Sequence, residues 1–191
     1  MFNCSNKYKI LKHKDINTKN NNILRIINIG SKSYKATAHF HNTIINCNIG
    51  ISGSISNKKE GDKKTPKGIF YATKLYYRAD KIQAIQTHIK KEIIKRNYKW
   101  CTDVSSYNYN KIIKNYINKK YETLWRNDNL YDLVITTTHN ESPIVKGNGS
   151  AIFLHVNNDE KRGSLGCITF KDSHLRRLLT NLNCKTIIHI K

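Results

Sequence analysis

"GSAIFLHVNNDEKRGSLGCITF", residues 149–170, is the stretch that decides how this chain folds. Residues 151–156 are apolar and β-prone, residues 157–163 are polar, and residues 166–170 return to a strand-like composition. Short apolar runs bounded by polar, glycine-bearing segments are typical of buried strands. The stretch therefore predicts a strand, a loop and a second strand.

Two reactive side chains lie in this stretch, His155 in the first apolar segment and Cys167 at the start of the second. A free thiol has a pKa near about 8.5, so a cysteine nucleophile needs a neighbouring base near neutral pH. His155 is the nearest candidate in sequence. Gly163 and Gly166 precede the cysteine, and glycine is favoured where a backbone takes unusual torsion angles or a substrate approaches closely. The pattern indicates a cysteine-nucleophile site.

The alternative is that Cys167 is an inert core residue. Cysteine is among the most buried residue types, and "CITF", residues 167–170, would suit a core strand. Short Cys/His spacings also recur by chance. The spacing alone leaves both interpretations open.

Together, His155, Ser164, Gly166 and Cys167 resemble the catalytic signature of the L,D-transpeptidase (YkuD-like) family, in which a His precedes a Ser/Thr-x-Gly-Cys box. A second stretch, "TPKGIF" at residues 65–70, resembles the upstream Thr-Pro-x-Gly-x-Phe core of that family. Like the family's segment, it follows an acidic, glycine-bearing turn. Two boxes in the right order make this a specific resemblance.

Residues 99–110 and 122–135 resemble the branch of the family that carries long insertions between the two boxes, and the resemblance covers about residues 48–190. One departure concerns substrate contacts. The family box continues Cys-hydrophobic-Arg, whereas Thr169 stands here and cannot bind a carboxylate as a guanidinium fork would. The family also often has Gly at the position of Val156 and His at that of Leu165. These differences predict altered substrate recognition with the nucleophile and base retained.

The resemblance implies an acyl transferase that acts on peptidoglycan stem peptides. In that reading Cys167 forms the thioester, His155 is the base, and Ser164 orients His155 or the substrate. The backbone N–H groups of Gly166, Leu165 and Cys167 stabilise the oxyanion. D-Alanine leaves, and an amine from a second stem peptide or a protein lysine, or water, resolves the thioester. The alternatives are an L,D-carboxypeptidase or endopeptidase on the same site, and a non-catalytic peptidoglycan-binding module.

Four further residues are candidates for substrate binding: Arg126, His139, Gly149 and Ser150. Arg126 either replaces the missing arginine or pairs with a nearby carboxylate such as Asp128, and we favour the structural role because such ion pairs are common. His139 ends an expected strand, but a lone histidine is more often structural or exposed.

The chain carries 34 Lys and Arg against 13 Asp and Glu, a formal net charge of +21. Such a charge alone would suggest a nucleic-acid partner, but the lysines are spread along the chain without a recognition motif. We therefore expect no nucleic-acid partner, and a basic surface would suit an anionic cell-envelope polymer. The five cysteines show no paired metal-binding spacing, so we expect no metal and no other cofactor. The disulfide state of the other four stays open: Cys4, Cys47, Cys101 and Cys184.

The resemblance implies the cell envelope, periplasm or secretion as the location. The first 22 residues are positively charged, but they lack the apolar run of about 7 to 15 residues that a secretory signal needs. No stretch approaches the roughly 20 apolar residues of a membrane-spanning helix. The sequence itself therefore shows no export signal and predicts no transmembrane segment.

The expected fold is mainly β, a sandwich or mixed sheet of the L,D-transpeptidase catalytic type with a few helices. Residues 1–20 are expected to be a loose polar tail, and residues 21–191 a single domain. The expected strands span 23–29, 33–40, 43–49, 133–139, 151–156, 166–170 and 186–190. Leucine spacing predicts a helix over 172–182, capped by Asp172 or Ser173, and isoleucine spacing predicts another over 82–93. Asp62 is expected to shape a turn.

Overall fold

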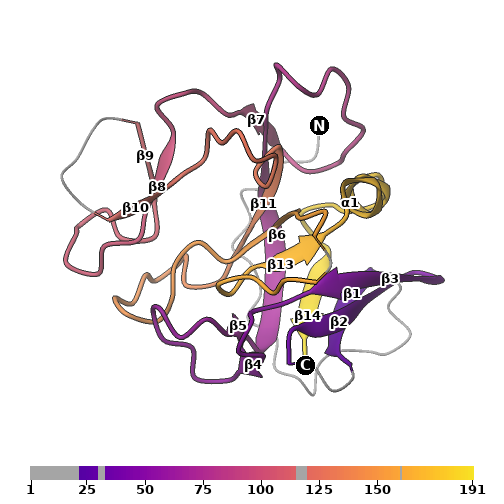
Figure 1. The fold of residues 1–191 in the computed structure, drawn as a ribbon, viewed down its shortest axis with the longest axis horizontal. Coiled ribbons are helices and arrows are strands. Elements are labelled where there is room, and N and C mark those ends of the chain that lie inside the picture. The colour runs from indigo at the N-terminus through magenta and orange to yellow at the C-terminus, as the bar shows by residue number, and fades with distance from the viewer. Residues whose placement is uncertain (1–21, 30–32, 115–119, 160) are drawn as a thin grey trace.

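The computed structural model describes residues 22–29, 33–114, 120–159 and 161–191. This part of the chain contains fourteen strands and one helix, so the expected mainly β fold is confirmed (Figure 1). The expected tail over residues 1–20 lies outside the described residues.

Nine strands form the largest sheet, which is mixed. They are β1 (Ile23–Asn28), β2 (Lys35–Phe40), β3 (Thr43–Asn48), β6 (Gly68–Tyr77), β7 (Lys91–Ile93), β11 (Leu133–Thr137), β12 (Phe153–Val156), β13 (Ile168–Phe170) and β14 (Ile187–Ile190). Their order is β11-β12-β13-β3-β2-β1-β14-β6-β7, and β11 also pairs with β6. That extra pairing closes the sheet on itself, with β7 attached to the outer edge of β6.

The sequence motif of residues 149–170 forms the adjacent strands β12 and β13, which run parallel, with His155 opposite Thr169. Because successive side chains in a strand point to opposite faces, each strand presents two sets of residues. Leu154 and Ile168, which are paired in register, belong to the apolar interior of the closed sheet. His155 and Thr169 therefore point to the outer face.

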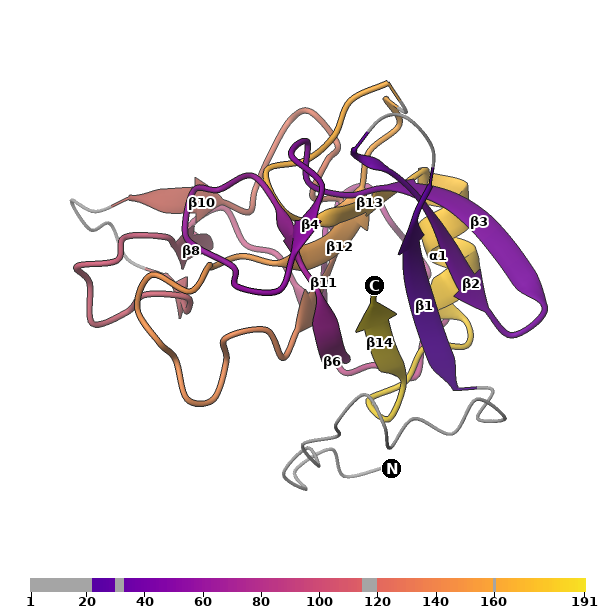
Figure 2. The same ribbon diagram turned by 90° about the horizontal axis from the view of Figure 1, so that it is seen from below.

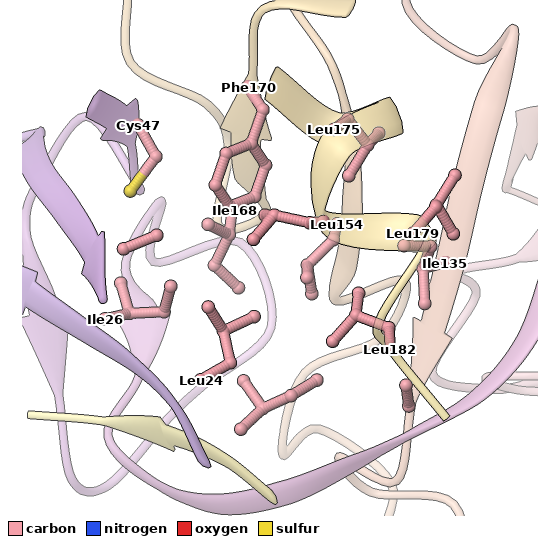
Figure 3. Close-up of a cluster of buried hydrophobic side chains, with 14 of the residues drawn as sticks. Leu24, Ile26, Cys47, Ile135, Leu154, Ile168, Phe170, Leu175, Leu179 and Leu182 are labelled. Carbon is pink, nitrogen blue, oxygen red and sulfur yellow. The ribbon is translucent and has the colours of Figure 1, made fainter. Parts of the chain in front are cut away.

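The interior of the closed sheet, called the inner core below, is filled by aliphatic and aromatic side chains from β1, β2, β3, β12, β13 and β14. The helix α1 (Asp172–Leu179), which follows β13, adds Leu175 and Leu179 to it (Figure 3). Leu178 of the same helix is also buried there. The helix is capped at Lys171 without a side-chain hydrogen bond, so the expected cap at Asp172 or Ser173 is wrong. Asp172 lies instead in the first turn and accepts a hydrogen bond from Arg176 (2.6 Å).

A second sheet consists of β8 (Lys99–Cys101), β9 (Ile112–Ile113) and β10 (Tyr121–Thr123). Both views place it on the far side of β11, β12 and β13 from α1 (Figures 1 and 2). Tyr98 and Leu124 at its edges pack with Phe153 and Cys167 in a second apolar cluster, called the outer cluster below. This sheet and its flanking residues, which the resemblance assigns to a long insertion and which are called the insertion below, thus cover the outer face that carries Cys167.

The two short parallel strands β4 (Ser54–Ile55) and β5 (Thr65–Pro66) form a separate pair that includes the Thr-Pro motif. The predicted helix over residues 82–93 is wrong, because the described structure has irregular backbone over residues 82–90 and the strand β7 over Lys91–Ile93. Ile82 and Ile89 are nevertheless buried in the inner core. Their spacing reflects burial, which an irregular segment on the sheet can achieve without helical turns.

Candidate active site

Cys167 lies immediately before β13 and is 8% exposed. Its thiol donates a hydrogen bond to the Ala151 carbonyl oxygen (3.0 Å), and the Phe153 N–H donates to its sulfur (3.4 Å). Burial raises the pKa of the thiol to about 12, although the Phe153 N–H and the positive charge of Lys58 act in the opposite direction. The resting sulfur is therefore a neutral, hydrogen-bonded thiol.

His155 is buried in β12, and its Nδ1 lies 2.8 Å from the Val156 carbonyl oxygen and 3.2 Å from that of Leu130. Because a carbonyl oxygen only accepts, Nδ1 carries the proton, and Nε2 keeps its lone pair. Burial lowers the pKa of His155 to about 4, so the ring is neutral near pH 7. The edge of Tyr131 packs against it, with ring centroids 4.9 Å apart. The ring is therefore held in the tautomer that a general base requires.

Strand geometry brings the two side chains to one face. Cys167 contacts the Phe153 backbone, two residues before His155 on β12, and precedes Thr169, the register partner of His155. Residues two apart on a strand share a face, so the outer face of β12 and β13 presents both the thiol and the imidazole. The Thr169 hydroxyl on the same face is buried and has no hydrogen-bond partner within the described residues.

The turn before Cys167 is held by two hydroxyl groups. The Ser164 hydroxyl donates to the Cys167 carbonyl oxygen (2.6 Å) and accepts from the Gly166 N–H (3.0 Å). The buried Thr65 hydroxyl donates to the Gly166 carbonyl oxygen and accepts from the Gly50 N–H, both at 2.8 Å. Ser164 therefore shapes the turn, and the Gly166 N–H is already engaged. The hydrogen bonds of Thr65 give a physical reason for the two sequence boxes to occur together.

Gly166 has a φ of +142°, and a side chain there would approach the Lys64 carbonyl oxygen to 3.0 Å. Both observations require glycine at this position. Leu165, the residue before it, is 71% exposed, so its apolar side chain lies on the solvent side of the turn.

On the other side of the thiol, the Ala151 peptide is fixed by the insertion. Ala151 has a φ of +52°, a conformation that L-residues adopt at a cost of about 1 kcal/mol. Its N–H donates to Asn110 Oδ1 (3.0 Å), which also accepts from Trp100 Nε1 (2.9 Å). Asn110 in turn donates to the Asn140 carbonyl oxygen (2.7 Å). The carbonyl that holds the Cys167 thiol thus belongs to a strained residue anchored by Asn110.

Sequence reasoning noted Trp100 and Asn110 only as part of an insertion motif. The residue type of Asn110 is the signal that could have identified its role. Asparagine tolerates the left-handed conformation found here (φ +55°), and its side-chain amide can form hydrogen bonds with several backbone peptide groups at once.

The four candidate substrate-binding residues lie in two places. Arg126 forms a bidentate ion pair with Asp128 and lies over the Tyr131 ring (5.1 Å), on the side of His155. His139 Nε2 lies 3.0 Å from the Asn148 carbonyl oxygen, and burial lowers its pKa to about 4. Gly149 adjoins His139, since a Cβ there would lie 3.1 Å from His139 Nε2, and the buried Ser150 follows it before β12.

Asp62 accepts hydrogen bonds from the backbone N–H groups of Lys59 and Lys64, both at 2.9 Å, so its expected role in a turn is confirmed. Among the residues that the structure describes, no group of three or more His, Cys, Asp or Glu side chains is arranged to hold a metal ion. Within the same residues, no helix has the length and apolar character needed to cross a membrane.

A search of curated proteins found no match. The structure of Bd1075 from Bdellovibrio bacteriovorus is similar at 16% identity and a TM-score of 0.44, over 88% of this chain and 47% of that chain. The chain thus spans about half the length of that protein. The model of the YkuD family, the L,D-transpeptidase catalytic domain, matches residues 14–190. The chain therefore belongs to the L,D-transpeptidase catalytic domain family.

Proposed function

We propose that this protein is a cysteine-dependent acyl transferase acting on peptidoglycan stem peptides, with Cys167 as the nucleophile and His155 as the base. The observation that carries the proposal is the state of His155. Its protonated Nδ1 is fixed by two carbonyl oxygens, which leaves Nε2 as a proton acceptor on the face that also presents Cys167.

The first half of the reaction forms a thioester. The Cys167 thiol leaves the Ala151 carbonyl oxygen and gives its proton to His155 Nε2, while the sulfur attacks the carbonyl carbon before the terminal D-alanine. Because the resting thiol and imidazole are both neutral, this proton transfer accompanies the attack and does not precede it. The C–N bond then breaks, and His155 returns the proton to the amine of the departing D-alanine.

The backbone N–H groups of Leu165 and Cys167 are the proposed donors to the oxyanion, each worth about 3 kcal/mol in comparable sites. The Gly166 N–H joins them if the substrate displaces its hydrogen bond to Ser164. Ser164 then acts through the turn, whose shape it fixes, and has no separate chemical step.

The second half transfers the acyl group. An amine from a second stem peptide or from a protein lysine loses a proton to His155 and attacks the thioester, the C–S bond breaks, and the thiol is restored. Water in place of the amine gives carboxypeptidase or endopeptidase activity. The net charge of +21 favours an anionic polymer as the surroundings, and we place the protein in the cell envelope on the strength of its family.

The test is to incubate the protein with disaccharide-tetrapeptide, alone and with an amine acceptor, and to follow intact mass and products by mass spectrometry. We expect an adduct of the tetrapeptide without its D-alanine, absent in Cys167→Ala and present in Cys184→Ala, which removes a different thiol. A crosslinked product identifies a transferase, and a tripeptide identifies a hydrolase. Binding of the stem without adduct or turnover would instead favour a non-catalytic peptidoglycan-binding module.

A further inference from the structure

A buried lysine lies in the segment between β4 and β5, upstream of the Thr-Pro motif. Lys58 is 6% exposed, and its Nζ donates to the Lys59 carbonyl oxygen (2.7 Å) and to Asp62 Oδ1 (2.5 Å). Asp62 is kept ionised, because its hydrogen bonds from Lys58 and the backbone outweigh its burial and lower its pKa. Removing an ammonium from water costs several kcal/mol, so a buried lysine calls for an explanation.

The side chain of Lys58 passes beside two glycines of the site. A Cβ on Gly149 would lie 2.8 Å from Lys58 Cγ and 3.2 Å from its Cε, and a Cβ on Gly166 would lie 3.7 Å from the same Cε. The Lys58 side chain thus occupies space that is open only because residue 149 is a glycine. Because Gly166 precedes Cys167, the charged end of Lys58 lies next to the turn that presents the nucleophile.

The charge of Lys58 acts on the nucleophile and on His139. It lowers the pKa of the Cys167 thiol against the larger effect of burial, and it adds to the burial that lowers the pKa of His139. Lys58 therefore places a positive charge near Cys167, although Lys58 itself lies outside β12 and β13.

Among the described residues, Lys58 is the cation whose charge acts on the Cys167 thiol. Thr169 is neutral, and the charge of Arg126, which is paired with Asp128, acts on His155. An ammonium has three N–H donors, and two of those of Lys58 are used within the described residues. The third can bind an incoming group.

We propose that Lys58 binds the terminal carboxylate of the substrate, on the amino acid that leaves. This inference rests on the proposed function, in which the bond attacked by Cys167 is the amide of a terminal residue. In such a residue the carboxylate carbon is two bonds from the nitrogen of the amide that Cys167 attacks. A cation beside Gly166, the residue before Cys167, is therefore within reach of that carboxylate. Lys58 is thereby a specificity-determining residue that selects substrates cleaved at a free C-terminus.

The test compares tetrapeptides that end in D-alanine or in D-alanine amide. A hydrogen bond between charged groups predicts that wild type prefers the free acid in kcat/KM by about 10- to 100-fold. Lys58→Met removes that preference by slowing the acid more than the amide, and Lys58→Arg keeps most of it. Lys59→Met, which changes the neighbouring exposed lysine, is the matched control and behaves as wild type. Equal rates for acid and amide in wild type, or an equal loss on both substrates in Lys58→Met, would overturn the proposal.

A second measurement does not depend on turnover. Iodoacetate and iodoacetamide differ by one carboxylate, so their relative rates of Cys167 alkylation, resolved by peptide mass mapping, report a cation beside the thiol. Lys58→Met lowers the ratio of iodoacetate to iodoacetamide rates, and an unchanged ratio contradicts the inference. If wild type forms no acyl-enzyme with either tetrapeptide, the proposed function fails, while this ratio still decides whether Lys58 attracts anions to Cys167.

Discussion

The two faces of the β12 and β13 pair differ in chemistry although they belong to the same few residues. The inner face consists of Leu154, Val156, Ile168 and Phe170, each at most 2% exposed and packed in the inner core. Figure 3 shows Leu154, Ile168 and Phe170 there. The outer face carries Phe153, His155, Cys167 and Thr169, which are equally buried to within a few per cent but mix apolar, titratable and hydroxyl groups.

This difference separates stability from chemistry along a single stretch of sequence. The inner face needs only apolar side chains that fill the available volume. Burying each of them contributes about 1.5 to 3 kcal/mol to the stability of the fold. The outer face is buried beneath the insertion, and its polar atoms need specific partners such as the carbonyl oxygens around His155. Substitutions on the inner face should therefore change stability, and those on the outer face should change catalysis.

The largest effect is expected from His155→Asn. The asparagine amide can still donate to the Leu130 and Val156 carbonyl oxygens, but it offers no base to the Cys167 thiol. We expect D-alanine release to slow by about 10²- to 10⁴-fold, the usual contribution of a general base, with the fold retained by circular dichroism. A rate within a few-fold of wild type would remove His155 from the mechanism.

The inner face is tested by Leu154→Ala, the residue next to His155. Truncating a fully buried leucine leaves a cavity and should lower the free energy of unfolding by about 2 to 5 kcal/mol in urea denaturation. The matched change on the outer face is Thr169→Val, which keeps the shape and removes a hydroxyl without a partner among the described residues. It should cost little or stabilise the protein. Equal losses in the two variants would contradict the assignment of the faces.

The same alternation explains what the sequence could predict. The strands around the core and the helix after β13 follow from apolar periodicity, because each has one face in the inner core. His155 and Cys167 were named from the motif, and the register of β12 and β13 puts them on one face.

Other features depend on contacts between distant segments, which local patterns do not encode. The isoleucines of residues 82–93 predict a helix that the structure does not form, because burial of Ile82 and Ile89 on the sheet imitates helical spacing. In the sequence Lys58 is one of many lysines. Only the positions of Gly149 and Gly166 in the fold show that its side chain lies at the site. Asn110 likewise acquires a role only when Ala151, 41 residues later, is placed beside it.

A smaller effect than those of His155→Asn on the rate and Leu154→Ala on stability concerns the pH dependence of stability, and it tests whether the outer face holds His155 neutral. The ordinary pKa of a histidine is 6.5, whereas the pKa of His155 in the folded protein is about 4, because burial disfavours the charged ring. Between these values the unfolded chain binds a proton that the folded chain does not, so stability falls as the pH falls. The contribution is present above about pH 6.5, and a shift of this size removes about 2 kcal/mol between pH 7 and pH 5.

His155→Asn isolates this contribution, because the other titrating groups are common to both proteins. Urea unfolding near pH 7 and pH 5 should give a loss of stability that is about 2 kcal/mol smaller in the variant than in wild type. Identical losses would mean that His155 is protonated in the folded protein at pH 5. In that case Nε2 would carry a proton in mildly acidic solution, and the imidazole could not accept the thiol proton there. The stability measurement therefore bears on the mechanism through the same property of the outer face, its exclusion of charge from His155.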